Sequence, residues 1–251
     1  MGDLLTPLAL GLGALVLFAR GFRRLRGRGR RREAGWDRAL LFGAGVLVGL
    51  AGLTVLHVPG EERASAHMLQ HMLLGDLAPL LVLLALRGPL LHAVVPRWLR
   101  RQLVRPPLAT LVRPAPSLAL WSVLLWAWHV PVLYDAALRH EALHLLEHAS
   151  FVVGGLLLWN VLIDPARRRA LSLWGSLAYA LAAMSIAQML VMVLIVSYRP
   201  LYAYGDVADQ SLAGLVMAVM QFITLGTFAC LRLRAHFRAP LALADGHPLG
   251  T

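Results

Sequence analysis

The residues of this chain best suited to chemistry are its histidines, several of which recur at intervals of four. His67 and His71 form one such pair, and His140, His144 and His148 form a run of three. Residues four apart lie on the same face of an α-helix, about 6 Å apart along its axis. Each run therefore predicts a ladder of imidazoles on one helix face, and imidazole is the commonest metal-ligating side chain.

Five histidines are the predicted ligands of a metal site: His67, His71, His129, His144 and His148. Met68 and Met72 neighbour the first ladder. Four further methionines lie at similar depth in later apolar segments: Met189, Met192, Met217 and Met220. Imidazole and thioether ligands together select copper, particularly Cu(I), so copper is the predicted metal. Because methionine also fills space in apolar helices, a role for these thioethers stays open.

The composition excludes several other chemistries. All 24 basic residues are arginine, so the chain can form neither a lysine Schiff base, as retinal pumps do, nor a lysine general base. Its single cysteine, Cys230, excludes disulfide frameworks, cysteine-rich zinc sites, iron–sulfur clusters and c-type haem attachment. Histidine and methionine are therefore the soft ligands that this chain has to offer.

The elements that must position these residues are membrane-spanning helices. Of the 251 residues 59% are hydrophobic and 15% are charged, against about 45–50% and about 25% in soluble domains. Seven segments approach the roughly 20 apolar residues that a span needs: 4–20, 39–57, 66–86, 116–133, 143–163, 173–197 and 211–231. The sequence predicts an all-α polytopic membrane protein. We expect a single seven-helix domain over residues 1–240 and a flexible tail over 241–251.

The arginines give the predicted bundle an orientation. Most of them fall into four segments: nine in 20–38, six in 87–115, three in 167–169 and three in 232–238. The other loops hold one each: Arg63, Arg139 and Arg199. Because positively charged loops stay in the cytoplasm, we expect the N-terminus outside and the C-terminus inside. The net charge of +11 then indicates membrane lipid rather than nucleic acid as the partner.

The same orientation sorts the ten histidines. His92, His236 and His247 fall on the cytoplasmic side. The other seven fall at or just below the outer surface: His57, His67, His71, His129, His140, His144 and His148. Any one of them could be an ordinary interfacial residue hydrated by water. Imidazoles buried in a bilayer are costly unless they have partners, so the set predicts an outward-facing site. On the inner surface, residues 96–104 predict a short amphipathic helix anchored by Trp98.

Three other functions compete with a copper site. Residues 140–144 read HEALH, which matches the H-E-x-x-H helix of zinc proteases with Glu141 as general base. Two histidines on facing helices could instead ligate a b-type haem in a membrane electron carrier. The chain could also be a structural scaffold that binds no metal. We expect no enzymatic activity, because the protease motif lacks a recognisable third ligand.

Four segments carry a resemblance to a known family. They are HMLQHMLLGDLAPLL (67–81), WHVPVLYDAAL (128–138), HLLEHASFVVGGLLLW (144–159) and DQSLAGLVM (209–217). In this order the chain resembles the seven-helix CtaG family of bacterial cytochrome c oxidase assembly factors, over about residues 57–225. The family pattern includes the five candidate histidines and also Asp209 and Gln210.

The resemblance implies a multi-pass protein of the bacterial plasma membrane that is needed to make an active haem–copper oxidase. Its implied partners are the oxidase subunits and an extracytoplasmic copper carrier. Its implied role is to bind or deliver copper on the outer side. Asp76 departs from the family pattern, and we expect it to pair with the histidine layer or with an arginine.

The position of the remaining polar residues completes the hypothesis. The copper ion is expected between the third, fourth and fifth helices, with His71 and His148 as the deepest ligands. Pro131 is expected to end the fourth helix and to open the bundle there. Three carboxylates would make the mouth of the site acidic: Asp135, Asp206 and Asp209. Solvated loops or helix caps are the alternative roles of these carboxylates.

Overall fold

A computed structural model describes residues 2–56, 62–203 and 205–244, and within these ranges the chain forms helices and no strand. His57 and His247 lie outside the described residues, as do the end of the second predicted span and most of the predicted tail. The helices run as follows: α1 (Gly2–Gly27), α2 (Trp36–Thr54), α4 (Ala64–Met72), η1 (Leu73–Leu77), α5 (Ala78–Ala85), α6 (Pro89–Val94), α7 (Arg97–Leu103), α8 (Leu108–Leu111), α9 (Pro114–Trp128), α10 (Pro131–Arg139), α11 (Glu141–Ile163), α12 (Leu173–Val196), α13 (Val207–Gln221), η2 (Phe222–Gly226) and α14 (Thr227–Ala244).

The described helices confirm six predicted spans as long, apolar elements and alter the fourth. Six helices are long and apolar enough to cross a membrane, and a bent pair makes a seventh if it counts as one span. The pair consists of α9 and α10, which meet at an angle of 73°. Pro131 begins α10, so the predicted break after His129 is confirmed. With 15 residues, α9 is only about 22 Å long, shorter than the predicted span over 116–133 and than a bilayer core of about 30 Å.

Two spans contain a widened turn. The third runs through α4, the π-helical turn η1 and α5. Pro79 has no N–H to donate to the carbonyl of Gly75 four residues earlier, which explains the local change of helix pitch. The seventh runs through α13, the π-helical turn η2 and α14, and the candidate span within them covers Val207–Arg238. It is therefore longer than the predicted 211–231.

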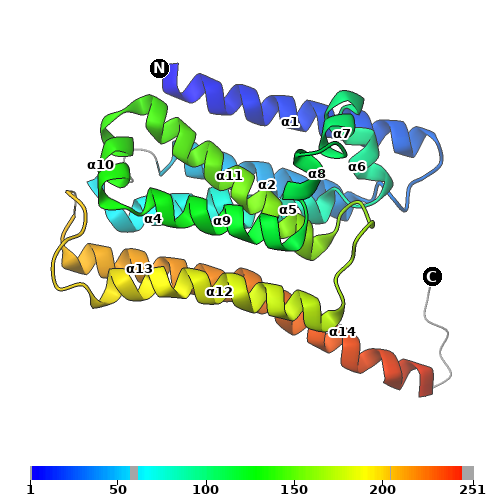
Figure 1. The fold of residues 1–251 in the computed structure, drawn as a ribbon. Helices are drawn as coiled ribbons and strands as arrows, with labels where there is room; N and C mark the ends of the chain where they lie inside the picture. Colours follow the sequence, from blue (N-terminus) through cyan, green and yellow to red (C-terminus); the bar gives the residue numbers. More distant parts are fainter. Residues whose placement is uncertain (1, 57–61, 204, 245–251) are drawn as a thin grey trace.

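Histidine-rich and arginine-rich segments lie at opposite ends of the bundle (Figure 1). One end, here called the histidine end, holds α10, the first turns of α4 and α11, and the loop 197–206. The other, the arginine end, holds the short helices α6, α7 and α8. The predicted helix at 96–104 is confirmed as α7. α1 begins at the histidine end and α14 leaves at the arginine end, so the chain starts and finishes on opposite sides.

Candidate metal centre

Two helices bring the predicted histidine ladders face to face near the histidine end. The ring centroids of His67 and His71 on α4 are 4.1 Å apart, and those of His144 and His148 on α11 are 4.2 Å apart. Across the two helices, His67 lies 5.4 Å from His144 and His71 lies 5.6 Å from His148. All four side chains are buried. The ladders therefore form two rungs, one turn apart in depth.

A pair of glycines allows α11 to approach the third span this closely. A side-chain carbon added at Gly155 would collide with the carbonyl oxygen of Gly75 in η1. One added at Gly75 would lie 3.3 Å from the Cβ and the carbonyl oxygen of Phe151. Because neither residue carries a side chain, the two backbones pack directly against each other. This contact lies less than two turns below His148 and fixes the depth of one ladder relative to the other.

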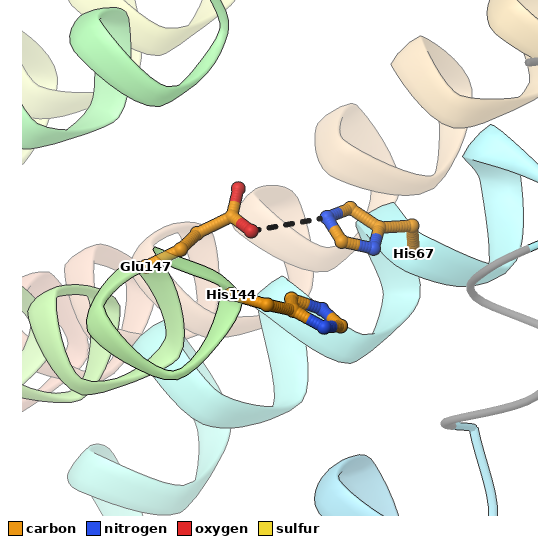
Figure 2. A group of neighbouring side chains, drawn as sticks. All are labelled: His67, His144 and Glu147. Atoms are coloured by element: carbon orange, nitrogen blue, oxygen red, sulfur yellow. Dashed lines mark ion pairs between the residues drawn. The ribbon is translucent and has the colours of Figure 1, made fainter. Parts of the chain in front are cut away.

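Glu147 joins the two rungs. Its carboxylate oxygens lie 3.6 Å from Nε2 of His67 and 3.5 Å from Nε2 of His71, and its side chain is fully buried. Figure 2 shows the carboxylate aimed at the His67 ring, with His144 beside it on the same helix as Glu147. We call the five residues the histidine–glutamate centre: His67, His71, His144, Glu147 and His148.

The sequence prediction did not include Glu147 among the ligands. A signal was present, because Glu147 follows His144 by three residues and therefore lies on the same face of the same predicted span. A carboxylate within a membrane span is itself a sign of function. The HEALH motif ends three residues before Glu147 and indicates Glu141 as the functional carboxylate instead.

Ligand atoms of the centre fall into two overlapping groups. His67, His144 and Glu147 offer one group and His71, His148 and Glu147 the other, and within each group the ligand atoms lie within 4.8 Å of one another. The edge of a tetrahedral site with bonds of about 2.0–2.1 Å measures about 3.4 Å, close to the two histidine–carboxylate distances. Both carboxylate oxygens of Glu147 and both ring nitrogens of His71 have no hydrogen bond from the described residues. These atoms fit a cation.

His129 lies beside the centre and faces a methionine. Its Nδ1 donates a hydrogen bond to the carbonyl oxygen of Leu125 at 2.7 Å, because a carbonyl can only accept. That bond leaves Nε2 as the basic nitrogen, 3.3 Å from the sulfur of buried Met68. The His129 ring is 6.4 Å from the His71 ring. The structure thus brings four of the five predicted histidines into the two groups and leaves His129 adjacent to them.

Aromatic residues form a roof over the centre at the histidine end. The Tyr134 ring of α10 lies edge-on to His67, with centroids 5.1 Å apart, and stacks on Tyr202 from the loop 197–206 at 3.9 Å. The Tyr202 hydroxyl donates to the carbonyl oxygen of His129. Burial, together with the nearby carboxylates of Asp135 and Glu147, raises the pKa of Tyr202 far above its ordinary value, so this hydroxyl keeps its proton.

Asp209 and Gln210, which follow the loop 197–206, hold the roof and the first histidine ladder in place. Gln210 is buried, accepts from the backbone N–H of Leu201 at 2.7 Å and donates to the carbonyl of Leu194 at 3.0 Å. The Asp209 carboxylate accepts from the backbone N–H of Ala64 at 2.6 Å and from Ser65. These bonds satisfy the first N–H groups of α4. Asp209 and Gln210 thus position α4 and the loop.

The other two carboxylates expected at the mouth also bind backbone. Asp206 accepts from the N–H of Asp209 at 2.8 Å and caps α13. Asp135 accepts from the N–H of Ala203 at 3.1 Å and ties α10 to the loop. The capping alternative therefore describes Asp206, whereas Asp135 bridges α10 and the loop.

Asp76 departs from the expected pairing. It lies buried in η1, where Oδ1 accepts from the indole N–H of Trp159 at 2.8 Å and Oδ2 accepts from the hydroxyl of Thr224 at 2.6 Å. Neither a histidine nor an arginine is its partner in the described structure, which corrects the expectation. Thr224 belongs to η2, so the hydrogen bond joins the widened turns of the third and seventh spans. A cavity of about 20 Å³, large enough for one water, lies between His71 and Asp76.

Several residues considered from the sequence lie away from the centre. His140 and Glu141 are exposed, and His140 precedes α11 with an extended backbone. Neither belongs to the potential metal groups found among the described residues, whereas His144, the second histidine of HEALH, belongs to one of them. Met189 and Met192 are mostly exposed on the outside of the bundle, whereas Met217 packs in the apolar core. Met72 lines the small cavity beside His71.

A haem would need more room than the cavity beside His71 offers. Cofactor pockets measure about 300–1,000 Å³, whereas the cavity that adjoins His71 measures about 20 Å³. The facing imidazoles are separated by ring contacts of under 6 Å rather than by a slot for a macrocycle.

Comparison with known families gives one match. The model of the family described as cytochrome c oxidase caa3 assembly factor matches residues 16–239, which is most of the chain. The match includes the histidine–glutamate centre, the roof and both widened turns. No curated protein and no solved structure matches the chain.

Proposed function

Because this chain belongs to the family of cytochrome c oxidase caa3 assembly factors, we propose that its histidine–glutamate centre binds copper as cargo for the oxidase. Assembly of the oxidase is the role that the family supplies, and it is a non-catalytic one. The observation that supports the cargo is the buried Glu147 carboxylate, held between two imidazole rungs with no hydrogen-bond donor from the described residues.

The donor set favours a transition metal of the copper type. Imidazole suits copper, zinc, iron and nickel, whereas thioether ligands select copper among them. Met68 contacts His129, and Met72 lines the cavity below His71. A carboxylate buried in a bilayer is costly without a counter-charge, and a bound cation supplies one. Copper is also the metal that a haem–copper oxidase must receive.

Two overlapping groups suit transfer better than storage. Glu147 is common to the outer group, with His67 and His144, and to the inner group, with His71 and His148. An ion can therefore change imidazole partners while it keeps its carboxylate ligand. Tyr134 covers His67 on the side of the histidine end, so exchange with an extracytoplasmic copper carrier requires this roof to move.

Metal analysis of the purified protein tests the site. We expect bound copper in the wild type and a clear decrease in the double variant His71→Ala with His148→Ala, which removes both imidazoles of the inner group. The double variant His92→Ala with His236→Ala is the matched control, because these histidines are exposed away from the centre. Equal copper in both double variants contradicts the proposal, and a helical far-ultraviolet spectrum of each variant excludes misfolding as the cause.

A second experiment separates copper delivery from a scaffold that binds no metal. We expect cells lacking the gene to lose oxidase activity under copper limitation. The wild-type gene should restore that activity and the His71→Ala, His148→Ala gene should not. Full rescue by a variant that binds no copper would favour the scaffold and overturn the cargo role while leaving the assembly role intact.

A further inference from the structure

A second concave site lies at the arginine end, far from the histidine–glutamate centre. It is a pocket of about 500 Å³ between the end of α1, the turn before α6, and α7. Six of its lining residues are basic: Arg24, Arg28, Arg30, His92, Arg97 and Arg100. No acidic residue lines it in the described structure. We call it the arginine pocket.

The positive charge of the arginine pocket is largely uncompensated. Arg30 is paired with Glu33 through Nε and a second guanidinium nitrogen. The Nε of Arg100 is buried and has no hydrogen-bond partner among the described residues. Guanidinium N–H groups match the oxygens of carboxylate and phosphate in planar, bidentate pairs. The pocket is thus arranged for a ligand that carries an anionic oxygen group.

The pocket is built into the fold by a close helix contact. A side-chain carbon at Gly21 would lie 2.6 Å from a methyl of Val94 and 2.9 Å from its backbone nitrogen, so α1 and α6 touch at this glycine. The turn before α6 requires Gly88, which has a φ of +62° and donates its N–H to the carbonyl of Pro165 at 2.7 Å. These contacts hold the arginines of α1 opposite those of α7.

The location of the pocket indicates which anion it meets. The apolar run of α1 gives way after Ala19 to arginine-rich turns, and these turns line the pocket. Three exposed tryptophans lie near the starts of helices at this end: Trp36, Trp98 and Trp174. Tryptophan concentrates at the level of lipid headgroups. Trp98 belongs to α7, which has no buried residue and carries Arg97 and Arg100 on the pocket side.

From these observations we propose that the arginine pocket binds the phosphate headgroup of an anionic phospholipid. A soluble phosphate compound would meet the same arginines, but it would gain nothing from the apolar surface of α1 and α7 that adjoins them. The acyl chains of a phospholipid can lie along that surface while its phosphate occupies the pocket.

Lipid binding to the full-length protein tests the proposal. The protein, purified in neutral detergent, is titrated with phosphatidylglycerol, with phosphatidylcholine and with inorganic phosphate, and bound lipid is counted by native mass spectrometry. We expect one phosphatidylglycerol to bind in preference to phosphatidylcholine. Arg97→Ala with Arg100→Ala should weaken this binding roughly tenfold or more, because each arginine near a lipid surface raises the affinity about fivefold.

A double variant at the end of α7 and just after it provides the control. Arg101→Ala with Arg105→Ala removes the same number of charges from the same region of the chain without changing the pocket lining, so phosphatidylglycerol should bind it as it binds the wild type. Arg24→Ala, on the opposite wall, should weaken binding without touching α7. Equal weakening by both double variants would mean general charge attraction and would overturn the site. Competition by inorganic phosphate at equal concentration would overturn the assignment to a lipid.

Discussion

At the scale of single residues, Glu147 is the side chain on which the candidate site depends. It contacts both rungs of imidazoles, at 3.6 Å from His67 and 3.5 Å from His71, and it is fully buried. A carboxyl group buried in that position must either be protonated or, when ionised, lie beside a cation. Because it lies between the two groups, its loss should weaken both at once, whereas the loss of one histidine should weaken only one.

Replacement of Glu147 by glutamine tests this directly. Glu147→Gln preserves the volume of the side chain and removes its charge, so we expect copper affinity to fall at least about tenfold. Glu141→Gln is the matched control, since Glu141 begins the same helix and is exposed. Competition with a copper chelator measures both affinities. Unchanged copper affinity in Glu147→Gln would contradict the hypothesis that Glu147 is a shared ligand. Loss of oxidase assembly in Glu141→Gln would support the zinc-protease hypothesis for HEALH.

Asp76 has a role separate from that of the metal centre. Its carboxylate holds the indole of Trp159 and the hydroxyl of Thr224 and so links three spans. Asp76→Leu leaves the indole N–H unpaired in the core, which should cost about 1–3 kcal/mol of stability. Asp76→Asn keeps an oxygen acceptor and should lose less. Thermal unfolding in detergent ranks the two variants, and equal unfolding temperatures would contradict this account.

At the scale of elements, the depth of the two ladders is set by the packing of α11 on the third span. Pro79 widens the helix at η1 and leaves the Gly75 carbonyl without its usual donor. Gly155 lies against that carbonyl, where a side chain would collide with it. A side-chain carbon added at the neighbouring Gly154 would instead lie 3.4 Å from the Trp121 side chain and 3.6 Å from the Leu124 side chain, which are ordinary contact distances.

These two glycines give a matched pair of variants. Gly155→Ala must push apart two backbones, which cannot relax as side chains do. We therefore expect the free energy of unfolding to fall by about 1–3 kcal/mol or more, and copper binding to be reduced. Gly154→Ala should have little effect. Thermal unfolding and copper content of both variants are the readouts. If Gly154→Ala is as damaging as Gly155→Ala, the close approach at Gly75 is not what fixes the site.

At the scale of the whole molecule, the bundle separates its two chemistries by its full length. The helix α10 and the first turns of α4 and α11, which carry the roof and the centre, lie near one end of the bundle, and α6 and α7, which line the arginine pocket, lie at the other (Figure 1). The arginine-rich loops indicate that their end faces the cytoplasm. We therefore expect the histidine end to face outward, where the proposed copper carrier could reach it.

Cysteine labelling tests this orientation. In a Cys230→Ser background, Ala203→Cys and Arg168→Cys each place one thiol at an exposed position, the first in the loop 197–206 and the second between α11 and α12. A membrane-impermeant maleimide should label Ala203→Cys in intact spheroplasts and Arg168→Cys only after permeabilisation. The reverse pattern would invert the orientation and place the centre on the cytoplasmic side.

The sequence alone determined the helical class, the approximate positions of six spans and the helix face on which each histidine ladder lies. These features follow from local composition and helical period, which do not depend on the tertiary contacts of each helix. Only the tertiary structure decided that α4 and α11 are partners, that Glu147 joins their rungs, that His129 turns to Met68 and that Asp76 pairs with Trp159 and Thr224. Those contacts join residues between about 60 and 150 positions apart, and they depend on how closely backbones pack at Gly75 and Gly155. Periodicity predicts the face of a helix but not the neighbour that this face will meet.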